Sequence, residues 1–226
     1  MRFFRFCLRF FPCLILALTI TFLGCAKVNP LYNRVSELRS HLFIGSGEHF
    51  SLAACYGFKE TPFNNDALLG EKVYAIHFKL DREVNQNATY NLSFNLAEKN
   101  YSLDFKFSPV THNLTAAVEL ENFNEKQFSV TVSSGGVSEV ITLSSIVPDG
   151  TIDYKTALDF LYKSQRPLID SFIDENGDFN AEIYTRVIVK DSKPYWYVGI
   201  ASGGGNLKAL LIDGFNGEVL AIREIF

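Results

Sequence analysis

Cysteine is almost absent from the chain once its opening stretch is set aside. Cys7, Cys13 and Cys25 lie within the first 25 residues, and the rest of the sequence contains Cys55 alone. If the opening stretch is removed, no intramolecular disulfide can form, and an uncleaved chain would be needed to pair Cys25 with Cys55. We therefore expect a fold that its hydrophobic core stabilises without covalent cross-links.

The chain also lacks an apolar run of the length that a typical transmembrane helix needs. Its longest run, residues 10–23, has about fourteen residues, whereas crossing a bilayer takes ~20. Three arginines precede this run, and small residues follow it at positions 24–26. That order is typical of a secretory signal. An uncleaved anchor helix, lengthened by the Phe-rich residues 3–11, is the alternative.

Residues 22–25, Phe-Leu-Gly-Cys, close this apolar run and resemble the lipobox of bacterial lipoproteins. Phe22 stands where Leu is usual in that motif, and Leu23 where a small residue is usual. The resemblance implies that residues 1–24 are a signal peptide and that Cys25 becomes a lipidated N-terminus carrying palmitate-type chains. Ordinary cleavage after Ala26, which would give a secreted protein, is the alternative.

Basic residues are not clustered in the part of the chain that remains. Three of the 21 basic residues leave with residues 1–24 and none of the 25 acidic ones does, so 18 basic and 25 acidic residues remain. The formal charge of the remaining chain is therefore −7. We expect no nucleic acid partner, because binding one takes a basic surface.

Hydrophobic periodicity divides the rest of the chain. Leu31, Val35, Leu38 and Leu42 recur at helical spacing and predict a short amphipathic helix after a tether at 25–30. Alternation with a period of two then predicts seven half-buried strands, which indicate an antiparallel β-sandwich within a domain spanning 31–148. These strands are centred on residues 50–58, 74–80, 90–96, 101–107, 116–120, 128–132 and 137–143.

A second unit, residues 151–226, follows the turn Pro148-Asp149-Gly150. Asp153 is a predicted N-cap for a helix that Pro167 should split or kink, because proline lacks the backbone donor. Four predicted strands follow. Helix and strands together indicate an α+β unit, with strands at about 182–190, 195–201, 207–212 and 218–224.

This second unit resembles a PepSY-like domain. The resemblance rests on residues 195–198, Tyr-Trp-Tyr-Val, and on residues 209–220, an apolar strand, an Asp turn, Gly-Glu and a second apolar strand. It implies an exported, non-catalytic module that restrains peptidases or binds at the cell surface. Many members of that family carry two such repeats, and this chain shows one.

The sequence contains no strong pattern of residues typical of a metal site or an active site. Asp174, Asn176 and Asp178 begin like a calcium loop, but Thr185 stands where the loop needs an acid. The four histidines lack ligand spacing, and Cys55 lacks a nearby cation in sequence. We therefore expect no metal, no cofactor and no enzyme activity. A hydrolase using Asp174, Asp178 and Glu182 is the enzymatic alternative.

An aromatic triplet is the strongest candidate for a binding surface. Tyr195, Trp196 and Tyr197 cannot all face inward on one strand, so either the tryptophan or the tyrosine pair points the other way. An exposed aromatic cluster is a common binding signature, and a contact between the two units is the alternative. The sequence thus predicts a cell-surface lipoprotein with a binding or protein-interaction role, anchored to the membrane through Cys25. A secreted peptidase inhibitor acting through residues 151–226 is the alternative.

Overall fold

The computed structural model describes residues 29–62, 70–81, 88–96, 98–109, 111–202 and 207–225. The predicted signal peptide, the predicted lipid attachment site at Cys25 and most of the predicted tether lie outside these ranges. Within them, no helix combines the length and the apolar character that crossing a bilayer requires.

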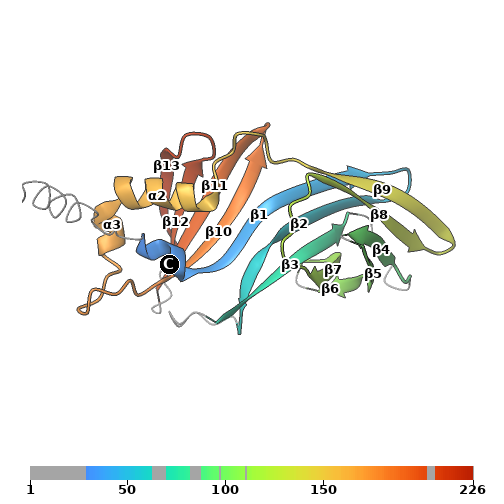
Figure 1. The fold of residues 1–226 in the computed structure, drawn as a ribbon, viewed down its shortest axis with the longest axis horizontal. Helices are drawn as coiled ribbons and strands as arrows, with labels where there is room; N and C mark the ends of the chain where they lie inside the picture. The colour runs from blue at the N-terminus through green and yellow to red at the C-terminus, as the bar shows by residue number, and fades with distance from the viewer. Residues whose placement is uncertain are drawn as a thin grey trace, which may run out of the picture.

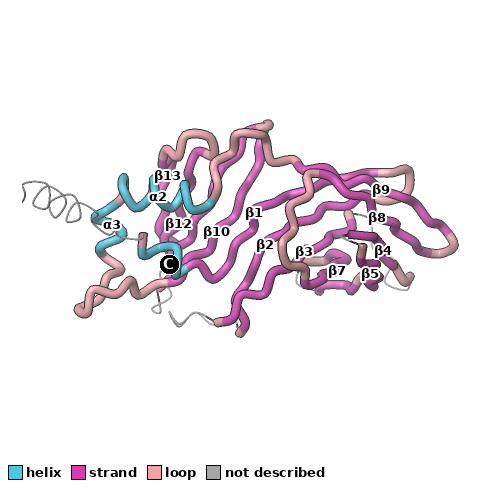
Figure 2. Tube along the Cα trace, viewed as in Figure 1, coloured by secondary structure: helices cyan, strands magenta, loops and turns pink. Residues whose placement is uncertain are grey.

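The described chain is mainly β, with one 3₁₀ helix and two short α-helices (Figures 1 and 2). The first lobe contains η1 (Pro30–Arg34), β1 (Val35–Ser46), β2 (Ser51–Thr61), β3 (Glu71–Leu80), β4 (Asn91–Leu96), β5 (Lys99–Asp104), β6 (Lys106–Ser108), β7 (Asn113–Glu119), β8 (Gln127–Ser134) and β9 (Val137–Ser145). The second contains α2 (Tyr154–Ser164), α3 (Arg166–Asp170), β10 (Glu182–Lys190), β11 (Lys193–Ala201), β12 (Leu207–Asp213) and β13 (Val219–Ile225).

One continuous sheet joins the two lobes. It runs β13-β12-β11-β10-β1-β2-β3-β7-β6, and a second branch, β9-β8-β4-β5, starts from β1. The sheet branches at β1 because the first part of this strand pairs with β10 in parallel and its later part pairs with β9 in antiparallel. The second branch curls over the first to form a half-barrel, visible at the right of Figure 1.

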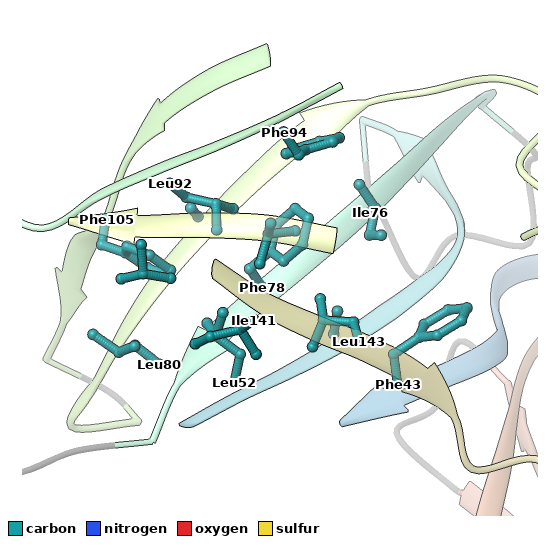
Figure 3. Close-up of a cluster of buried hydrophobic side chains, with 14 of the residues drawn as sticks. Phe43, Leu52, Ile76, Phe78, Leu80, Leu92, Phe94, Phe105, Ile141 and Leu143 are labelled. Atoms are coloured by element: carbon teal, nitrogen blue, oxygen red, sulfur yellow. The ribbon is translucent and has the colours of Figure 1, made fainter. Parts of the chain in front are cut away.

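Two hydrophobic cores lie on the inner side of this sheet. The first fills the half-barrel, where Phe78, Leu92 and Ile141 point into one shared layer (Figure 3). The second lies between α2 and the sheet β10–β13, and it includes Leu158, Leu161 and Val198. Leu31, Val35, Leu38 and Phe58 from the beginning of the chain complete this second core. Both cores therefore include residues of β1 and β2, and η1 contributes to the second core.

The helix predicted from Leu31 to Leu42 is wrong. Apart from the single turn of η1, this stretch is strand β1. The pairing register shifts between Val35 and Glu37 and again between Arg39 and His41, so β1 carries two bulges. Each bulge adds a residue, and inward positions there fall three apart instead of two. That spacing places Val35 and Leu38 three apart, as in a helix, whereas Leu31 lies in η1 and Leu42 pairs with Cys55 on the other face.

The other predicted elements agree with the structure, with one strand divided. The predicted strand 101–107 is interrupted at Phe105, which separates β5 from β6. Asp153 caps α2 by accepting a hydrogen bond from the Thr156 N–H at 2.8 Å. The helical segment breaks at Gln165, and Pro167 lies in the first turn of α3. The mainly antiparallel β architecture is thus confirmed, and a helical segment and a further sheet follow the half-barrel.

A close approach of two backbones at the second bulge requires glycine at position 57. A Cβ atom built on Gly57 would lie 1.7 Å from the carbonyl oxygen of Leu38, which is far inside van der Waals contact. Backbone atoms cannot move aside as a flexible side chain can. The bulge in β1 therefore leaves no room for any residue larger than glycine at position 57.

We predict that Gly57→Ala lowers the free energy of unfolding by about 3 kcal/mol, the upper range for overpacked sites. The matched control is Gly199→Ala, because a Cβ there would lie 3.3 Å from the mobile end of Leu207. The control should cost less than about 1 kcal/mol. Urea unfolding of both variants measures the difference, and equal losses would contradict the role assigned to Gly57.

Candidate binding surface on the outer sheet face

The aromatic triplet divides between the two faces of β11. Trp196 is 2% exposed in the second core, and its Nε1 donates a hydrogen bond to the carbonyl oxygen of Ile152 at 2.9 Å. Tyr195 and Tyr197 are half-buried on the opposite face, which we call the outer sheet face. The tyrosine pair, and not the tryptophan, therefore points away from α2.

Strand pairing sets the neighbours of these tyrosines on the outer sheet face. Tyr197 pairs with Arg186 of β10, Arg186 pairs with Arg39 of β1, and Arg39 pairs with Gly57 of β2. Paired residues point to the same face, so two guanidinium groups lie on adjacent strands beside a tyrosine ring. Lys59 adds a third cation on β2, beside Glu37. We call Tyr195, Tyr197, Arg186, Arg39 and Lys59 the outer band.

Specific contacts order the arginines of the outer band. The guanidinium of Arg186 lies over the ring of Tyr197, 4.7 Å from its centroid. Arg39 Nε lies 2.7 Å from Glu37 Oε1, and the Arg39 side chain remains 48% exposed. Arg39 thus has an acidic neighbour on its own strand. The outer band itself brings three cationic side chains together on a chain whose formal net charge is −4.

A pocket of 250 Å³ lies at the β1–β2–β3 end of the outer band. Arg39 and Lys59 lie at its side, and Cys55 pairs with His77 across β2 and β3. Burial raises the pKa of the Cys55 thiol, which the charge of Arg39 only partly offsets. Burial, together with Arg39 and Lys59, lowers the pKa of His77. Near neutral pH the pocket therefore holds a neutral thiol and a neutral imidazole.

The protonation state of the thiol does not favour a nucleophilic cysteine. A nucleophilic cysteine needs a lowered pKa, which a cationic and well-solvated environment provides. Cys55 has the opposite shift. Guanidinium and ammonium groups beside tyrosine rings instead suit carboxylates or phosphates, which accept charge-assisted hydrogen bonds.

The acidic residues considered from the sequence make structural contacts of their own. The Asp174 carboxylate accepts hydrogen bonds from the backbone N–H groups of Asn176 and Asp178, each at 2.9 Å, so it closes a turn before β10. Glu182 is fully buried and accepts a hydrogen bond from the Tyr184 hydroxyl at 3.0 Å. Among the residues that the structure describes, no cluster of three or more His, Cys, Asp or Glu side chains could hold a metal ion.

Sequence reasoning found the two tyrosines of the outer band and missed its cations. Arg186 is a single exposed charge in the middle of the otherwise largely apolar β10, and that isolation is a usable signal. No sequence pattern indicates that Arg39 pairs with Arg186, because this pair depends on the parallel pairing of β1 with β10.

Comparison with models of known protein families finds no match, and comparison with curated proteins finds none.

We predict that Cys55 reacts with iodoacetamide more slowly in the folded protein than after unfolding in urea, because burial raises the pKa of its thiol. The measurement uses a chain in which Cys7, Cys13 and Cys25 are replaced by serine. The folded-state rate should rise only at a pH above that at which the unfolded chain reacts. Equal rates in both states would show that Cys55 is an ordinary exposed thiol.

Proposed function

We propose that this protein is an exported lipoprotein, anchored to the membrane through Cys25, that binds a partner protein through the outer band without catalysing a reaction. The sequence of residues 1–25 supports the export and the anchor. The second unit's resemblance to a PepSY-like domain supports a cell-envelope protein or a peptidase as the partner.

The position of Asn29 is the observation that carries the proposal. Its side-chain amide donates hydrogen bonds to the carbonyl oxygen of Leu158 at 3.1 Å and to the Asp159 carboxylate at 3.0 Å. Asn29 is therefore fixed to α2, on the inner side of the sheet. Cys25 precedes it by four residues, a length that spans at most about 14 Å. A lipid on Cys25 would hold the α2 side close to the membrane.

The outer band then points away from the anchor. It lies on the sheet face opposite α2, so a membrane near α2 would leave Tyr197, Arg186 and Arg39 accessible. Arginine and tyrosine are the residue types that contribute most at protein interfaces. The guanidinium groups of Arg39 and Arg186 suit an acidic surface on the partner.

We predict that Cys25→Ala moves the protein from the membrane fraction to the soluble exported fraction, because two or more acyl chains are needed for a stable anchor. Mass spectrometry of the wild-type N-terminus should show a lipidated Cys25. A wild-type chain that begins at Lys27 would contradict the anchor and support simple secretion. Intact Met1 on protein from the cytosol would contradict export.

We further predict that Arg186→Glu weakens partner capture from the native cell envelope by about ten-fold, because it places a repulsive charge in the outer band. Tyr197→Ala should weaken it in the same direction by removing the ring beneath the guanidinium. Lys163→Glu on α2 is the matched control, since it reverses an exposed cation on the other side of the sheet. Quantitative cross-linking measures capture, and equal recovery with Arg186→Glu would contradict this role of the outer band.

A further inference from the structure

A cleft of 490 Å³ lies at the open side of the half-barrel, and its lining includes none of the five outer-band residues. In the described sheet, β5 pairs with β4 and β6 pairs with β7, so these two strands are the free ends of the two branches. The beginning of β3, the strand β5 and the loop after β7 line the cleft. The chain thus leaves a hollow where the barrel does not close.

Two tyrosines present ordered rings to this cleft. The Tyr101 ring stacks on Phe94 of the first core at a centroid distance of 4.9 Å and an interplanar angle of 17°. Tyr74 is 39% exposed, and its ring packs edge-on against Phe58 at 5.2 Å. Core contacts thus hold one side of each ring, so a ligand that stacks on the ring loses little side-chain entropy.

The charged groups of the cleft have both signs. Glu71, Glu119 and Glu121 line it together with Lys72 and Lys99, and Asn122 adds an amide. An anionic ligand would meet three carboxylates, and a cationic ligand would meet two ammonium groups. A neutral ligand that carries many hydroxyl groups can use all of them, because hydroxyls donate to carboxylates and accept from ammonium groups.

The solvent face of the neighbouring branch has an independent and matching chemistry. The outward residues of β4, β5, β8 and β9 are almost all uncharged and short, although an ordinary protein surface is about 25–35% charged. Strand pairing arranges these side chains in rows about 4.8 Å apart. The rows include the pairs Asn95–Asn100, Ser93–Ser102, Ser93–Thr131, Ser129–Thr142 and Ser133–Ser138, with Asp104 and Val140 as the exceptions.

This uncharged face adjoins the cleft. A shallow pocket of 420 Å³ on it is lined by Ser93, Asn95, Asn100 and Thr131. Tyr101 lines both that pocket and the cleft. The two features therefore meet at the edge strand β5, where the Tyr101 ring lies on the core side of the strand and the hydroxyl and amide groups lie on its opposite face.

We propose that this surface is a binding site for a neutral polysaccharide chain. Tyr74 and Tyr101 stack against the apolar faces of sugar rings. Glu121, Lys99 and Asn122 bond to sugar hydroxyls in the cleft, and the chain continues over the Ser, Thr and Asn rows. The site is distinct from the outer band and does not depend on the lipid anchor or on a partner protein.

The test is isothermal titration calorimetry of the chain from Ala26 onward with four neutral tetrasaccharides. Two are built from glucose, one α-linked and one β-linked, the third from N-acetylglucosamine and the fourth from mannose. Tetragalacturonate serves as an acidic comparator. At least one neutral sugar should bind with a Kd below about 1 mM, and the acidic sugar should bind more weakly. No binding by any neutral sugar, or tighter binding of the acidic one, would overturn the proposal.

Substitutions of exposed residues test where the sugar binds without disturbing the fold. Glu121→Ala and Asn122→Gly change exposed loop residues and should each weaken binding several-fold, while Tyr74→Ala should weaken it about ten-fold. Ser93→Lys tests the uncharged face in the same assay. Glu125→Ala, an exposed glutamate of the same loop that does not line the cleft, should bind like the wild type. Sugar binding that Glu121→Ala, Asn122→Gly and Ser93→Lys leave unchanged would place the site elsewhere and overturn the assignment.

Discussion

The backbone pairing of β1 is the constraint on which the rest of the structure depends. One edge of this strand bonds to β2, and the other edge bonds first to β10 and then to β9. Buried backbone donors and acceptors must be paired, so all three partners are needed along its twelve residues. Because the same strand lies in both cores, the half-barrel and the α2-covered sheet form one structural unit. A cut between residues 148 and 151 would remove Val35, Leu38 and Phe58 from the second core.

The two bulges in β1 adapt one strand to two lobes. They keep Val35, Leu38, His41 and Phe43 on the inner side while the strand changes partners. A bulge also increases local twist, which helps the sheet to turn from the flat second lobe into the curved first lobe. The second bulge constrains the sequence at position 57, where glycine is needed because a Cβ atom would collide with the carbonyl oxygen of Leu38.

Most of the fold could be predicted from the sequence because its strands follow a strict period of two. The strands around residues 74–80 and 128–132 lie where alternation places them, and Asp153 and Pro167 mark the beginnings of the two α-helices. The failure at residues 31–42 has a physical cause, since bulges depend on partners that only the folded chain supplies. The candidate site was predictable in part. Tyr195 and Tyr197 stand out in the sequence, whereas the meeting of Arg39 and Arg186 requires a parallel pairing that no local pattern indicates.

The alternation that builds the cores also separates them from the surfaces that we propose to bind ligands. Along the strands, inward residues such as Val130 and Val198 belong to the cores, while their neighbours Thr131 and Tyr197 point to the other face. This explains how one sheet carries a cationic, aromatic face and an uncharged, hydroxyl-rich face. A whole-chain charge of −4 averages over these faces and conceals both. Both proposed binding surfaces therefore consist largely of outward residues, which become visible only when the strands are aligned in their paired rows.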